Sequence, residues 1–159
     1  MDWLKVAIGA FSATNIMTAF SYLISYHFKI LFKEPVLLNY ILKSRNLTVP
    51  GRFEKITGWF AHYIIGFLFV AMYETIWHYT KIEFGWISGI VFGVVSAFVG
   101  MLGWKIMYHL PDKKPDVPLK EFYLQLFAAH VVFAVVVVCA FKIYEYNPLA
   151  HIEASLAEL

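Results

Sequence analysis

Residues 119–146 read LKEFYLQLFAAHVVFAVVVVCAFKIYEY, and this stretch decides the fold. At its centre, residues 131–139 form an unbroken apolar block. A hydrocarbon core about 30 Å thick needs about 20 mostly apolar residues in a helix that rises about 1.5 Å per residue. The stretch is therefore long enough and apolar enough to cross a bilayer.

Three further stretches of the same kind lie at about residues 3–28, 56–78 and 85–109. The chain has 159 residues, of which 60% are hydrophobic and 15% charged; ordinary soluble domains have about 45–50% apolar and about 25% charged residues. A soluble domain of this length has a single core, which cannot bury so much apolar surface. We predict an all-α polytopic membrane protein, a single bundle of four transmembrane helices with an acidic tail at residues 147–159. Disordered chains, disulfide scaffolds and soluble enzymes are excluded.

The tryptophans agree with these four spans. All five lie within about six residues of a predicted span end, where amphipathic indole rings prefer to sit. They are Trp3, Trp59, Trp77, Trp86 and Trp104.

The basic residues predict the orientation, because cytoplasmic loops are enriched in Lys and Arg. Of the 13 basic residues, only Lys5, Lys81 and Lys142 lie toward the ends of the spans that face the termini. The remainder lie in or beside the first and third loops. We therefore expect a multi-pass protein of a bacterial inner (plasma) membrane, with both termini outside the cytoplasm. The first apolar run is too long for a cleaved signal peptide.

The first loop contains a predicted short helix over residues 34–43. Pro35 suits the first turn of a helix, and lysines lie at both ends. We expect this helix to lie in the cytoplasmic membrane interface. It is a connector held at the lipid headgroups or, alternatively, a gate or docking element.

The third span carries a stripe of small residues at helical spacing. Such stripes let membrane helices approach closely. The stripe predicts a tight contact within the bundle, with a second copy or with a partner subunit; a substrate groove lined by backbone is the alternative. Its members are Gly85, Gly89, Gly93, Ala97 and Gly100.

Ionisable groups inside a bilayer are costly and are functional candidates by default. His62, Glu74 and His130 are the three main candidates in this chain, since the other histidines lie at span ends or in the tail; Tyr73 lies on the His62 face. The first span adds Asn15 and Thr18, which either hold helices together or line a polar path. Together these six residues predict a ligand site or a proton path; the alternative is a pair of neutral histidines that hydrogen-bond across helix contacts.

Cofactor and catalytic motifs are sparse. His62 and His130 could ligate a b-type haem, which needs two imidazoles at similar depth, but they differ by about five residues, or roughly 7 Å, in depth. No His-x-x-x-His or paired-Cys spacing predicts a metal site. No His-Glu-x-x-His or Gly-x-Ser-x-Gly motif predicts catalysis. The net charge of +2, without a basic cluster among aromatic residues, gives no reason to expect a nucleic-acid partner.

The last three spans also carry a pattern that resembles a known family. His62 is followed by Tyr73, then by Trp86-x-x-Gly89 and two prolines, and the last span contains Glu121 and His130. This pattern is similar to the YagU-like group of small uncharacterised bacterial inner-membrane proteins. The resemblance implies a four-helix inner-membrane protein in which His62, Tyr73, Glu121 and His130 are the positions of interest.

Three functional hypotheses follow. The first is a non-enzymatic membrane protein whose buried His/polar site between helices binds a small solute or lipid, or supports proton-linked transport. The second is a haem-binding or electron-transfer subunit. The third is a structural accessory subunit, with the glycine stripe as its docking face. Beyond the lipid bilayer, we expect the partner to be a second copy of the chain or another membrane subunit.

Overall fold

A computed structural model of the protein describes residues 1–30, 32–48 and 51–146. These residues form five α-helices and one short 3-10 helix, and they contain no strand. The all-α prediction is confirmed. In chain order the elements are α1 (Trp3–Phe28), α2 (Glu34–Ser44), η1 (Gly51–Ile56), α3 (Thr57–Tyr79), α4 (Trp86–Tyr108) and α5 (Leu119–Glu145).

Four of the described helices, α1, α3, α4 and α5, are long and apolar enough to cross a membrane. Each begins and ends within one residue of a predicted span. The predicted four-span architecture is therefore confirmed at the level of helix number, length and composition. The predicted acidic tail at residues 147–159 lies outside the described residues.

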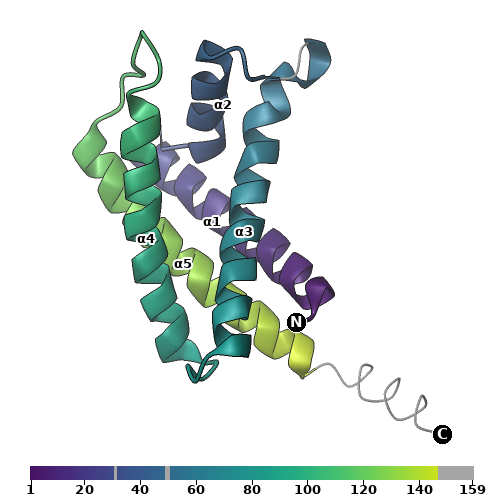
Figure 1. Cartoon of the computed structure of the whole chain (residues 1–159). Helices are drawn as coiled ribbons and strands as arrows, with labels where there is room; N and C mark the ends of the chain where they lie inside the picture. Colours follow the sequence, from purple (N-terminus) through teal and green to yellow (C-terminus); the bar gives the residue numbers. More distant parts are fainter. Residues whose placement is uncertain (31, 49–50, 147–159) are drawn as a thin grey trace, which may run out of the picture.

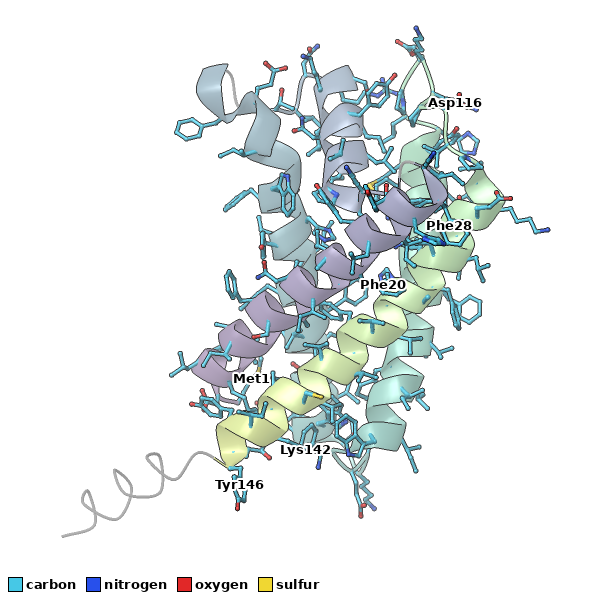
Figure 2. The ribbon with its side chains drawn as sticks, turned by 180° about the vertical axis from the view of Figure 1, so that it is seen from behind. Met1, Phe20, Phe28, Asp116, Lys142 and Tyr146 are labelled. Carbon is cyan, nitrogen blue, oxygen red and sulfur yellow. The ribbon has the colours of Figure 1, made fainter. Side chains whose placement is uncertain are left out.

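The four long helices form two layers. α1 and α5 pack antiparallel along much of their length, with Met1 and Tyr146 at one end and Phe28 at the other (Figure 2). α3 packs on α1 and α4 packs on α5, which makes the second layer (Figure 1). α3 and α4 are close at the 80–85 loop and diverge toward their opposite ends, where α2 lies between them (Figure 1).

A reversal of the chain after α1 places α2 between the diverging ends of α3 and α4. Lys29 adopts the left-handed conformation (φ 55°), which ends α1. α2 then begins at Glu34 with Pro35 in its first turn, as predicted. Its residues Glu34, Pro35, Leu37, Leu38 and Ile41 are buried. One side of α2 is therefore packed against protein, while its location in the membrane interface stays a prediction.

Small residues bring α4 close to α5. A Cβ atom added at Gly93 would lie 2.9 Å from the Cβ of Ala134, and one added at Gly89 would overlap the side chain of Val138. Ala97 is fully buried. Most of the small-residue stripe is thus used for packing within the chain. Gly85 is different: it precedes α4, and a Cβ atom there would have open space.

Buried apolar side chains gather in two clusters, one toward each end of the bundle. The first cluster includes Val6, Val70, Tyr73, Val137 and Phe141. The second includes Phe32, Leu38, Trp104, Phe122 and Leu126. A space between these clusters is not filled by side chains, and several predicted site residues border it.

Candidate functional site

A cavity of about 220 Å³ lies between the two apolar clusters and is bordered by all five α-helices. Most of its lining is apolar, from residues such as Met17, Leu38 and Leu126. Its polar lining comes from four side chains on four helices, namely Thr14, Glu34, His62 and His130. Concave apolar sites with a few converging polar groups are typical of small-molecule binding sites.

The cavity reaches the outer surface between α3 and α4. Two residues of its lining, Ile65 on α3 and Val99 on α4, are also 38% and 51% exposed. Both are apolar and lie within predicted transmembrane helices. The divergence of α3 from α4 therefore leaves a lateral opening on the face that the predicted topology places in lipid.

His62 projects from α3 toward α1. Its Nε2 lies 3.1 Å from the hydroxyl oxygen of Thr18, and that hydroxyl donates its own hydrogen to the Thr14 carbonyl at 2.6 Å. Because the Thr18 hydrogen is committed, the His62 Nε2 is assigned as the donor of the shared bond, and its Nδ1 is then an acceptor. The sequence singled out both His62 and Thr18, and the structure brings them together.

His130 projects from α5 toward α4. Its Nδ1 donates to the Leu126 carbonyl at 2.8 Å, which leaves Nε2 as an acceptor. A Cβ atom at Gly100 would lie 2.7 Å from this Nε2, so glycine is needed to give the ring its place. The Phe69 ring meets the imidazole edge-on at 5.8 Å. Both histidines border one cavity, a proximity that sequence spacing alone did not reveal.

Glu34 forms a buried polar network with α1 and α5 that sequence reasoning missed. Its Oε1 accepts from the Ser21 hydroxyl at 2.8 Å and from the Gln125 amide at 3.0 Å. The same Gln125 nitrogen donates to Ser21 at 2.6 Å. The available signal was a pair of polar residues, Ser21 and Gln125, inside predicted spans, where polar groups need partners.

Three buried oxygen atoms near this site lack hydrogen-bond partners in the described part of the chain. They are the Thr14 hydroxyl, Oε2 of Glu34 and Oε1 of Gln125. The Glu34 side chain is only 1% exposed, and this burial raises its pKa from 4.5 to about 7. Buried polar atoms without partners are costly and call for an explanation.

The remaining predicted site residues do not line the cavity. Tyr73 donates to the Ser96 hydroxyl at 2.6 Å and so joins α3 to α4. Glu74 lies 2.9 Å from the ammonium group of Lys5 near the end of the bundle that carries the start of α1 and the end of α5. These contacts link helices, and among the described residues no chain of hydrogen bonds joins either of them to the histidines.

Asn15 also lies outside the cavity. Its amide nitrogen donates to the Phe11 carbonyl at 2.7 Å, and its amide oxygen accepts from the Tyr63 hydroxyl at 2.9 Å. The Asn15 side chain is exposed at the junction of α1 and α3. Glu121, which the family resemblance implied, is exposed on α5.

A haem held by two histidines needs an available ring nitrogen on each. The Nε2 of His62 is bonded to Thr18, so the ring nitrogens left to ligate an iron are the Nδ1 of His62 and the Nε2 of His130. Among the described residues, no group of three or more His, Cys, Asp or Glu side chains is arranged to hold a metal ion.

A scan against models of known protein families and searches of curated proteins and solved structures find nothing that matches this chain. The resemblance to the YagU-like group therefore stays a prediction. Functional inference rests on the cavity and its polar groups.

Proposed function

We propose that this protein is a non-enzymatic membrane protein that binds a small, largely apolar molecule in the cavity between α3 and α4. The observation that carries the proposal is the cavity itself, in which the Thr14 hydroxyl has no partner among the described residues and the Nε2 of His130 is an available acceptor. A bound molecule with an apolar body and one polar group would satisfy this lining.

The cavity volume indicates the size of the ligand. A dry engineered cavity of about 150 Å³ binds benzene, whereas drug-sized ligands occupy pockets of about 300–1,000 Å³. At about 220 Å³, this cavity suits a molecule with a single ring or an equivalent short chain. Larger lipids would have to leave most of their length outside.

The lateral opening at Ile65 and Val99 supports entry from the bilayer, where apolar molecules concentrate. This route requires the predicted membrane location. The distribution of basic residues supports a bacterial inner membrane with the α2 end of the bundle in the cytoplasm. With this orientation, the cavity lies nearer the cytoplasmic side of the membrane.

A matched pair of glycine substitutions tests the proposal. Gly103 lines the cavity, and a Cβ atom there has open space, so Gly103→Leu should occupy the cavity without displacing backbone. Gly85→Leu adds the same side chain outside the cavity, also into open space. Both variants are expected to fold.

The measurement is equilibrium dialysis of the protein in lipid nanodiscs against radiolabelled benzyl alcohol, with binding to empty nanodiscs subtracted. We expect saturable binding to the wild type and to Gly85→Leu, and affinity about tenfold or more weaker in Gly103→Leu, a loss of about 1.4 kcal/mol or more. Equal binding to the two variants would place the ligand outside the cavity and refute the proposal.

A further inference from the structure

Glu34 is a buried carboxylate with half of its acceptor capacity unused. Oε1 accepts two hydrogen bonds, while Oε2 has no partner in the described part of the chain. The side chain borders the cavity and is 1% exposed. A buried carboxyl group with these contacts requires either a proton or a cation.

No basic side chain of the described chain forms an ion pair with Glu34. Tyr22 on α1 is close enough to Glu34 for the two side chains to interact electrostatically. The ammonium group of Lys33 lies over the Tyr22 ring, 4.7 Å from its centre. The other titratable groups that border the cavity are His62 on α3 and His130 on α5; α4 contributes none. The described residues around Glu34 therefore supply no counter-charge.

The rest of the lining also suits a positively charged donor. The His130 Nε2 is an acceptor, and the Thr14 hydroxyl can accept as well. Three aromatic side chains, Phe69, Trp104 and Phe133, border the same space. Aromatic rings attract ammonium groups, most strongly where water is excluded.

We propose that the ligand is a lipophilic ammonium ion whose nitrogen binds the Glu34 carboxylate and whose apolar body fills the cavity, in exchange for a proton. This inference rests on the proposed function and names its ligand class. A hard metal cation fits less well, because such ions take about six or more oxygen ligands. Glu34 and Gln125 supply one unpartnered oxygen each.

Exchange with a proton follows from the burial of the carboxyl group. Burial raises the pKa of Glu34 to about 7, so near neutral pH the group can hold a proton when the cavity is empty. Binding of an ammonium ion favours the ionised carboxylate and releases that proton. Apparent affinity for the ammonium ion should therefore fall as the pH is lowered.

The experiment compares benzylamine, which is protonated at both pH values used, with neutral benzyl alcohol in the same dialysis assay. At pH 8 the wild type should bind benzylammonium about tenfold or more tighter than benzyl alcohol. At pH 5 this ratio should fall close to one, because Glu34 is then protonated. Glu34→Gln should also have a ratio close to one at pH 8. Glu121→Gln, which removes an exposed carboxylate from α5, should keep the wild-type ratio.

The ratio of two affinities on one variant does not depend on how much of that variant is folded. The same ratio in wild type and Glu34→Gln would overturn the inference. So would wild-type protein that binds benzyl alcohol but does not prefer benzylammonium, although the proposed function would then stand. Binding of neither probe to the wild type would refute the proposed function and this inference together.

Discussion

Glu34 has surroundings that are unusual for a carboxylate, since its side chain is buried. Its pKa is raised from 4.5 to about 7 because burial disfavours the ionised carboxylate. The folded protein therefore prefers the protonated form. This contribution to stability is complete at pH values below 4.5 and is lost as the pH rises through 7.

We predict that the wild type is less stable at pH 8 than at pH 5, by about 2–3 kcal/mol at most from this residue. Glu34→Gln is neutral at both pH values and should lose most of that difference. Thermal unfolding in detergent at the two pH values measures it, with the exposed Glu121→Gln as control. A pH dependence in Glu34→Gln as large as in the wild type would show that Glu34 is not the source.

Sequence reasoning identified some site residues and missed others for a physical reason. His62, His130 and Thr18 stood out because polar groups are rare inside apolar spans. Glu34 did not, since it follows Lys33 in a predicted loop, and a charged residue is expected in any solvated loop. Its burial depends on the reversal at Lys29 and on packing between distant segments, which local patterns do not encode.

At the scale of helices, the contact between α4 and α5 depends on small residues. At Gly93 an added Cβ atom would lie 2.9 Å from the Cβ of Ala134 and 3.1 Å from the Cα of Val131. The second neighbour is backbone and cannot move aside alone. The α4 stripe thus serves contact within the chain, so Gly89 and Gly93 are not available as the docking face of an accessory subunit.

Two valine substitutions on α4 test this packing. Gly93→Val should destabilise the protein by about 1–3 kcal/mol, the usual cost of inserting bulk into a packed contact. Gly103 lies nearer the C-terminal end of α4. The added side chain of Gly103→Val meets open space there and should leave stability nearly unchanged. Thermal unfolding of the purified variants measures both. Equal unfolding temperatures for the two would contradict the α4–α5 contact.

The bounds of the four long helices could be predicted because a continuous apolar run of sufficient length permits little else in a bilayer. The divergence of α3 from α4 and the insertion of α2 between them could not. Both arise from which side chains fit at contacts far apart in the sequence, such as those of Trp104 with Phe122. Trp104 also lines the cavity, so the cavity wall includes a residue held by such a contact.

At the scale of the whole molecule, the two ends of the bundle differ. The end formed by α2 and the 109–118 loop carries most of the basic residues, and the other carries Met1, Tyr146 and the 80–85 loop. The positive-inside rule predicts that the first end faces the cytoplasm. The orientation determines whether Glu34 lies nearer the cytoplasmic or the outer side of the membrane.

Single cysteines introduced into a Cys139→Ser background test the orientation. Lys81→Cys lies in the loop between α3 and α4, and Asp112→Cys lies in the loop between α4 and α5; both positions are exposed. In intact spheroplasts, a membrane-impermeant maleimide should label Lys81→Cys and should label Asp112→Cys only after lysis. The reverse pattern would invert the predicted topology.

The central claim is that the space between α3 and α4 is a ligand site, and photolabelling tests it most directly. A benzylamine that carries a diazirine is irradiated with the protein in nanodiscs, and the modified peptides are identified by mass spectrometry. We predict adducts within residues 62–69 and 99–107, which include the α3 and α4 parts of the cavity lining, and their loss in Gly103→Leu but not in Gly85→Leu. Adducts only at residues that do not line the cavity, or adducts at lining residues that persist in Gly103→Leu, would contradict the claim.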